Sequence, residues 1–162
     1  MVIIRRYRLK EADNKVKQVI SYEISACPIC SGEMKVIGSR SRMVIDSGGT
    51  TLSITIRRLR CGGNCGKIHH ELPDMLIPYK RYCAETIEKI IAGDEESVSC
   101  DGRAIWRIRA WWAACILYFE SVMASLREKY GVEFCMCAPR EIVRAAANAH
   151  LWPHTRSAYM PA

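Results

Sequence analysis

Alternating hydrophobic and polar positions predict β-strands through the first sixty residues. The runs with strand character cover residues 2–9, 16–22, 33–38, 41–46 and 51–60. In the last run Leu52, Ile54 and Ile56 alternate with serine, threonine and arginine, so one face is apolar and the other polar. The glycine-containing segment 47–50 separates the last two runs, which predicts a β-hairpin.

The hydrophobic period changes to that of helices in the second half of the chain. Residues 71–78 form a proline-bounded connector, and residues 80–92 then place apolar side chains at helical spacing up to Gly93. A longer helix begins after Ser99 or Asp101, either of which can cap it, and ends at Gly131. Pro139 starts a last helix over residues 140–149. Two helices separated by a glycine turn and a short element predict a helix-turn-helix.

Two close cysteine pairs bracket the predicted hairpin, with two intervening residues in the first pair and three in the second. The four cysteines are Cys27, Cys30, Cys61 and Cys65. This is the ligand spacing of a four-thiolate zinc ribbon, in which Zn²⁺ is held in a tetrahedron by two tight turns. Gly32 and Gly66, just after the pairs, permit the left-handed backbone that such turns need. Buried or disulfide-bonded cysteines and an iron–sulfur cluster are the alternatives.

The fold class that follows is α+β: a small β-rich zinc ribbon followed by an all-α helix-turn-helix domain. We expect residues 1–78 to hold the N-terminal strands and the ribbon, and residues 79–162 to hold the helices. His69 and His70, just past the second cysteine pair, are interpreted as hydrogen-bonding or phosphate-facing residues. A second metal site is the weaker reading, because its first pair is too closely spaced and follows no readable hairpin. Its ligands would be Cys135, Cys137, His150 and His154.

Composition indicates the setting of the protein. The 162 residues include 24 Lys and Arg against 17 Asp and Glu, a net charge of +7, which suits a polyanion such as nucleic acid. Nine cysteines, an odd number, and no secretory signal favour the reducing cytoplasm. The longest apolar stretch, residues 110–119, is far shorter than the ~20 residues that span a bilayer, so no membrane partner is expected.

Basic residues near the cysteines and in the long helix are candidate DNA contacts. Those predicted to contact phosphates are Arg57, Arg58, Arg60, Lys67 and Lys80. Arg103 and Arg107, one turn apart near the start of the long helix, are predicted to read base edges in the major groove. All of them fit ordinary solvated faces as well. The tryptophans of that helix fit either a helical core or a platform that stacks on unpaired bases. They are Trp106, Trp111 and Trp112.

The cysteine pairs, the Arg-Arg-Leu-Arg run before Cys61 and the Ile-His-His-Glu-Leu-Pro-Asp run after Cys65 resemble the N-terminal zinc ribbon of several bacterial transposase families. The chain looks closest to small uncharacterised bacterial proteins, mainly from Firmicutes, that share this ribbon. Residues 104–112 resemble the helix-turn-helix that follows it, and the resemblance covers roughly residues 25–112, with residues 151–158 a further candidate stretch. It implies four zinc-ligating cysteines and a DNA-binding helical part. The extra glycine in the second cysteine pair departs from the commoner spacing.

Catalytic carboxylates on readable strands are missing from the sequence after Trp112, so we expect no catalytic residues and no enzymatic activity. The sequence therefore predicts a zinc-dependent protein that binds double-stranded DNA. Its role would be that of an accessory or regulatory subunit of a mobile element, with a transposase or recombinase as protein partner. Two alternatives are an adaptor that docks on a recombinase or polymerase, and a binder of single-stranded DNA or RNA. The sequence leaves the DNA target and the oligomeric state open.

Overall fold

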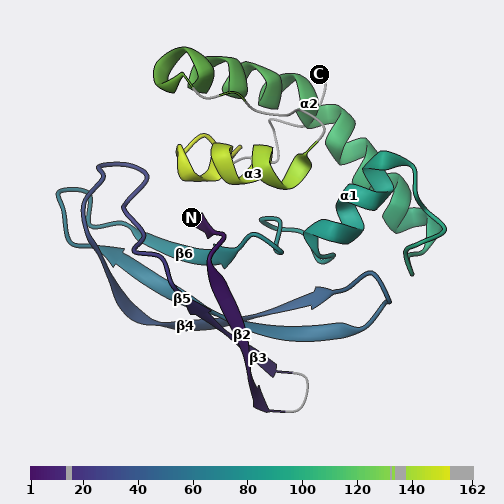
Figure 1. Ribbon diagram of the computed structural model, residues 1–162, viewed down its shortest axis with the longest axis horizontal. Helices are drawn as coiled ribbons and strands as arrows, with labels where there is room; N and C mark the ends of the chain where they lie inside the picture. The colour runs from purple at the N-terminus through teal and green to yellow at the C-terminus, as the bar shows by residue number, and fades with distance from the viewer. Residues whose placement is uncertain (14–15, 132, 134–137, 154–162) are drawn as a thin grey trace.

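One mixed β-sheet organises the N-terminal half of the protein (Figure 1). The computed structural model describes residues 1–13, 16–131, 133 and 138–153. The strands are β1 (Val2–Ile4), β2 (Tyr7–Asp13), β3 (Val16–Ser21), β4 (Met34–Ile45), β5 (Thr51–Cys61) and β6 (Ile68–Pro73). Their order is β1-β6-β5-β3-β2, with β4 paired along the other edge of β5. The β1–β6 and β3–β5 pairs are parallel and the others antiparallel, and the sheet curls into a half-barrel.

Three helices lie on the same side of this sheet (Figure 1). They are α1 (Ala84–Ala92), α2 (Gly102–Tyr130) and α3 (Pro139–Asn148). The predicted stops of α1 and α2 are confirmed, because Gly93 and Gly131 adopt left-handed backbone with φ of 89° and 65°. Asp101 caps α2 by accepting a hydrogen bond from the Ala104 backbone N–H at 2.8 Å.

A single hydrophobic core joins the sheet to the helices. Ile54 and Ile56 of β5 belong to the same buried cluster as Ile87 of α1, Phe119 of α2 and Ile142 of α3. Polar contacts reinforce this core at its edges. The Asn148 side chain of α3 exchanges two hydrogen bonds with the Ile3 backbone of β1, and Arg140 of α3 pairs with Glu88 of α1 at 2.9 Å.

The predicted fold class, a small zinc ribbon followed by an all-α helix-turn-helix domain, is wrong. The hairpin of β4 and β5 is continuous with the N-terminal strands, since β5 also pairs with β3 and β6. The long helix α2 has 29 residues, about 43 Å at 1.5 Å per residue. It packs on α1 and α3 and shares one buried cluster with the sheet, rather than forming a separate helical domain. The boundary after residue 78 stays a prediction.

Strand β6 explains the error. Residues 71–78 read as a connector, whereas Ile68–Pro73 is a strand that lies between β1 and β5. The sequence of β6 does not alternate between polar and apolar residues, so it lacks the usual strand pattern. Its polar residues His69 and Glu71 are nevertheless buried, each beside a polar partner. None of the helices that the structure describes is long and apolar enough to cross a membrane.

Candidate metal centre and basic surface

The four cysteines predicted as ligands lie together at one end of the sheet. Cys27 and Cys30 belong to the segment between β3 and β4, Cys61 ends β5, and Cys65 precedes β6. All four Sγ atoms lie within 4.8 Å of one another. The Cys27–Cys65 and Cys30–Cys61 sulfur distances are both 3.4 Å. The arrangement confirms that the two turns face each other.

These distances fit a single tetrahedral metal ion. With Zn–S bonds of ~2.3 Å, sulfurs at the corners of a tetrahedron lie about 3.8 Å apart, and the sulfur separations here bracket that value. A disulfide needs ~2.05 Å, so the 3.4 Å contacts exclude that alternative, and all four cysteines are free. The four cysteines could therefore hold a metal ion.

Backbone geometry around each turn brings the sulfurs inward. Gly66 has the expected positive φ, 57°, but in the first turn this conformation belongs to Ser31, with φ of 56°. Gly32 is needed for a different reason: a Cβ there would lie 3.2 Å from both the Cys61 sulfur and the Gly63 Cα. The Gly62 N–H donates to the Glu33 carbonyl at 2.9 Å, which joins the two turns directly.

A buried polar layer supports the cysteines from behind. His69 is 3% exposed, and its Nε2 lies 3.4 Å from the Cys27 sulfur. Burial lowers the pKa of His69 to about 4, so the ring is neutral near pH 7 and fits the hydrogen-bonding role predicted for it. Glu71 is 1% exposed, and its carboxylate accepts hydrogen bonds from Arg57 Nε at 2.6 Å and Nη2 at 2.8 Å. It also accepts a hydrogen bond from the Ser25 hydroxyl at 2.8 Å. Of these groups His69 contacts a candidate ligand directly, and such an outer contact fixes the orientation of a metal ligand.

The thiols differ in acidity without a metal. Hydrogen bonding from the Gly32 backbone, followed by contact with Cys61, lowers the pKa of Cys30, whereas burial raises the pKa of Cys61. Four adjacent thiols do not all ionise on their own, because like charges repel. A bound cation would compensate for that repulsion, which couples metal binding to proton release.

The weaker second metal site is not described by the structure. Cys135, Cys137 and His154 lie outside the described residues. Among the residues that are described, the four-cysteine group is the only set of three or more potential ligands brought together.

The residues predicted to contact phosphates occupy different environments. Arg57 is held by Glu71, as described above. Arg60 and Lys67 are exposed near the cysteines, and Arg58 is half-buried on β5. The Lys80 ammonium lies 4.0 Å from the centre of the Trp111 ring, and burial lowers its pKa to about 8.

The residues predicted to read bases, Arg103 and Arg107, are exposed in the first turns of α2. Neither forms an ion pair with a described acidic residue, in contrast to Arg109, which pairs with Glu95.

Two further arginines, on the same face of the sheet as Arg58, were not predicted from the sequence. Arg40 and Arg42 of β4 pair in register with Ile56 and Ile54, and Arg58 of β5 pairs with His70 of β6. Because alternate residues of a strand share a face, all four basic side chains project from one face of the sheet. The signal was available: residues 39–42 read Ser-Arg-Ser-Arg, which places both arginines on one side of an extended strand.

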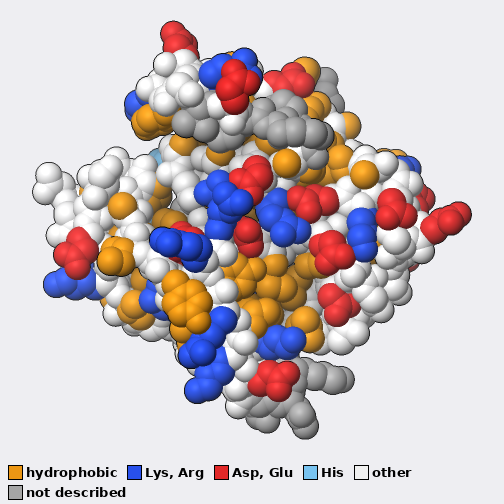
Figure 2. Space-filling model, viewed as in Figure 1, with side chains coloured by type: hydrophobic (Ala, Val, Ile, Leu, Met, Phe, Trp, Pro, Cys, Tyr) orange, Lys and Arg blue, Asp and Glu red, His pale blue; other side chains and the backbone are white. Residues whose placement is uncertain are grey.

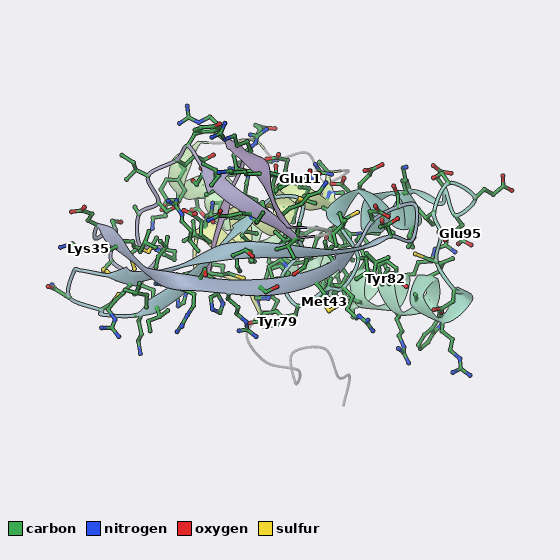
Figure 3. The ribbon with its side chains drawn as sticks, turned by 90° about the horizontal axis from the view of Figure 1, so that it is seen from below. Glu11, Lys35, Met43, Tyr79, Tyr82 and Glu95 are labelled. Atoms are coloured by element: carbon green, nitrogen blue, oxygen red, sulfur yellow. The ribbon has the colours of Figure 1, made fainter. Side chains whose placement is uncertain are left out.

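We group the basic residues of this sheet face with Arg103 and Arg107 of α2 and call the set the basic surface. It comprises Arg40, Arg42, Arg58, His70, Arg103 and Arg107. Lys80 connects the two parts: its carbonyl accepts a 3.5 Å contact from Arg42 Nη2, and its ammonium covers Trp111, one turn beyond Arg107. Side chains ending in nitrogen line the lower edge of Figure 3, on the side where Tyr79 lies.

Comparison with known proteins adds one finding. A family model described as a domain of unknown function, DUF6431, matches residues 27–108. The chain belongs to this family. No curated protein and no solved structure matches it.

The DUF6431 match begins at the first cysteine of the cluster and ends in the second turn of α2. It therefore contains both cysteine pairs and every residue of the basic surface. The metal centre and the basic surface belong to the same family segment.

The three tryptophans of α2 occupy two kinds of environment, the helical core and the exposed surface. Trp111 and Trp112 are half-buried against the core, and Trp112 packs on Phe119 with ring centres 5.7 Å apart. Trp106, one residue before Arg107, is 70% exposed.

Proposed function

We propose that this protein is a zinc-dependent nucleic-acid-binding protein, in which the metal fixes one end of the sheet that carries the basic surface. Four thiolates in a tetrahedron are typical ligands of Zn²⁺. The supporting geometry is the set of sulfur separations, between 3.4 and 4.8 Å. When bound, zinc supplies folding free energy and rigidity, since structural zinc sites stabilise the folded chain directly.

The observation that carries the nucleic-acid proposal is the lack of acidic partners on the basic surface. Within the described part of the chain, no Asp or Glu forms an ion pair with Arg40, Arg58, Arg103 or Arg107. Most of the other arginines that the structure describes have such a partner, for example Arg140 with Glu88. A surface of unpaired cations is the electrostatic footprint of a polyanion partner.

Duplex DNA is the preferred partner. Arginines from the sheet would contact phosphates, while Arg103 and Arg107 would extend from the exposed first turns of α2 toward base edges. For this division of contacts, only the N-terminal end of α2 has to enter the major groove. By its resemblance to transposase-type zinc ribbons, the protein would serve a mobile element as an accessory or regulatory subunit.

One observation favours a second candidate, the binding of single-stranded nucleic acid. The 70% exposed Trp106 ring lies in sequence between Arg103 and Arg107. Exposed aromatic rings beside arginines stack on unpaired bases in single-strand binders. Competition between a labelled duplex and an unlabelled single strand decides between the two partners.

The test of the proposal measures binding of zinc-loaded protein to a duplex selected from random sequence, and to unselected duplex. Arg107→Ala should weaken binding to the selected duplex by about 1–3 kcal/mol and reduce sequence preference. Arg127→Ala is the matched control, because Arg127 is exposed on the same helix at its other end. Equal losses for the two variants, or equal losses on selected and unselected DNA, would contradict base reading by Arg107.

A further inference from the structure

A cavity lies within the sheet part of the basic surface. Two adjoining cavities, of about 280 and 470 Å³, share Arg40 and His70 in their walls. Arg42 completes the first cavity and Arg58 the second. Three guanidinium groups and an imidazole therefore border this pair of hollows.

Strand register accounts for this concentration of basic groups. Arg58 of β5 pairs with His70 on one side and with Gly38 on the other. Gly38 has φ of 150° at an irregularity of β4, and a Cβ built there would meet no atom within 4 Å. The residue opposite Arg58 in β4 is therefore a glycine, which adds no side chain of its own.

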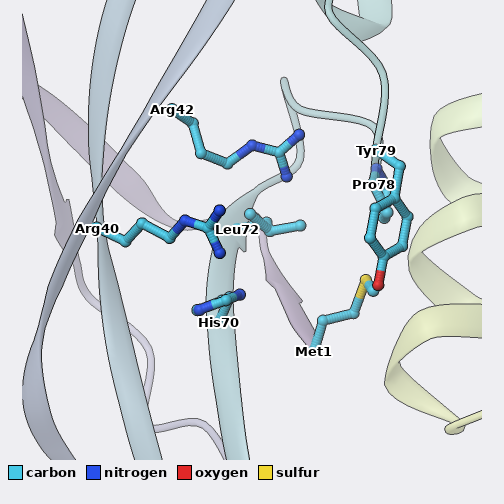
Figure 4. A pocket seen from close by; sticks show the side chains of 7 residues that line it. All are labelled: Met1, Arg40, Arg42, His70, Leu72, Pro78 and Tyr79. Atoms are coloured by element: carbon cyan, nitrogen blue, oxygen red, sulfur yellow. The ribbon is translucent and has the colours of Figure 1, made fainter.

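The opposite wall is apolar and conformationally strained. Figure 4 shows Arg40 and Arg42 directed toward Leu72, with the Tyr79 ring across the pocket from them. Tyr79 has φ of 63° and is 73% exposed. A left-handed backbone is costly for a bulky residue, and such strain gathers at ligand sites. The turn is held by the Lys80 N–H, which donates to the Ile77 carbonyl at 3.1 Å.

The basic groups of the pocket repel one another. Burial, followed by the charge of Arg40, lowers the pKa of Arg42. Burial and the charges of Arg40, Arg58, the Met1 amino group and Arg42 lower the pKa of His70. Among the described residues no carboxylate lines either cavity. An anion in the hollow would relieve this repulsion.

We propose that this pocket binds a phosphate group, held by Arg40, Arg42 and Arg58 and bordered by His70 and Tyr79. Arginine suits this ligand because its planar fork donates two parallel hydrogen bonds to phosphate oxygens. The inference goes beyond the proposed function, since a pocket for one phosphate group serves a free nucleotide as well as a nucleic-acid backbone.

The experiment titrates zinc-loaded protein, freed of excess metal, with inorganic phosphate and then with pyrophosphate, and follows arginine Nε–H and backbone signals by NMR. We expect shifts at Arg40, Arg42 and Arg58. Arg40→Gln and Arg58→Gln should each lower phosphate affinity at least tenfold. Arg8→Gln is the charge-matched control, because Arg8 is an exposed arginine of β2 outside both cavities, and it should change the affinity less than twofold.

A variant that keeps the charge separates a built pocket from a general positive field. Arg58→Lys should lose at least threefold in phosphate affinity, because a lysine cannot reproduce the two-donor fork. Equal affinity losses in Arg8→Gln and Arg40→Gln, or shifts confined to residues outside the pocket, would overturn the proposal. Zinc content and melting temperature confirm that each variant is folded.

The source of the phosphate is decided by competition. If a duplex without terminal phosphates displaces inorganic phosphate, the pocket is assigned to backbone phosphates. If a nucleoside monophosphate displaces it and the duplex does not, the pocket is assigned to a free nucleotide. Both outcomes support the pocket. If duplex binding persists without any phosphate response at Arg40 and Arg58, the pocket proposal fails and the proposed function stands. If phosphate binds but no nucleic acid does, the proposed function fails and the pocket stands.

Discussion

Arg57 of β5 and the arginines of α3 differ from those of the basic surface in one respect: they have acidic partners. Arg57 pairs with buried Glu71, and Arg140 and Arg144 pair with Glu88 and Glu141. Lys or Arg side chains lie next to Asp or Glu over the centre of the face in Figure 2. Arg40 and Arg58 have no such partner among the residues that the structure describes.

This difference separates two roles for one residue type. A paired arginine joins elements of the fold, as Arg57 joins β5 to β6 and Arg140 joins α3 to α1. A cluster of arginines without acidic partners gains no ion-pair stabilisation in the free protein, and its like charges repel one another. Where a chain breaks a local rule without a structural gain, a functional reason is expected.

The largest effect should follow loss of the proposed metal ion, whose four candidate ligands lie together at one end of the sheet. Cys61→Ser should abolish stoichiometric metal binding and unfold the region around the two cysteine pairs, because a structural metal supplies folding free energy. Metal analysis and amide hydrogen exchange measure this. The control is Cys100→Ser, since Cys100 is free and lies outside the four-cysteine group. A Cys61→Ser protein with unchanged metal content and protection would refute the assignment.

The next effect concerns a paired arginine. Glu71→Gln leaves the one-third exposed Arg57 guanidinium without a charged partner, and losing such hydrogen-bonded contacts costs about 1–3 kcal/mol. We expect that loss in the free energy of unfolding measured by denaturant. Glu96→Gln, at an exposed glutamate, should stay within about 0.5 kcal/mol. Similar values for the two variants would mean that the Arg57–Glu71 pair has no structural role.

The smallest effect concerns His70, which belongs to the basic surface. Because the folded protein lowers the pKa of His70 from 6.5, the unfolded chain binds the proton more readily. Stability from this group is therefore complete above pH 6.5 and declines as the pH falls below it. Phosphate in the pocket should raise the His70 pKa, which NMR titration of the ring measures with and without phosphate. An unchanged or lower pKa on phosphate addition would separate His70 from the pocket.

Features set by nearby residues were predictable from the sequence. The cysteine spacing identified Cys27, Cys30, Cys61 and Cys65, and glycine and aspartate signals placed the ends of α1 and α2. Each of these depends on a few adjacent positions, so no knowledge of distant contacts is needed.

Features set by distant pairing were not predictable in the same way. The sequence of strand β6 looks polar because it contains His69 and Glu71. Their burial is possible because Cys27, Ser25 and Arg57 contact them, and only the fold brings these residues together. Without β6 the hairpin appeared to be a separate ribbon. The pocket was missed for the same reason, since Arg40, Arg58 and His70 come from three strands.

The most direct test of the account is the salt dependence of duplex binding by zinc-loaded protein, measured for the wild type, Arg40→Gln/Arg58→Gln and Arg8→Gln. Each phosphate contact removed should reduce the slope of log affinity against log salt by about 1. We therefore predict a slope about 2 smaller for the double variant and an unchanged slope for Arg8→Gln. Identical slopes for all three proteins, or binding that does not weaken with salt, would contradict the claim that the unpaired arginines hold a nucleic-acid backbone.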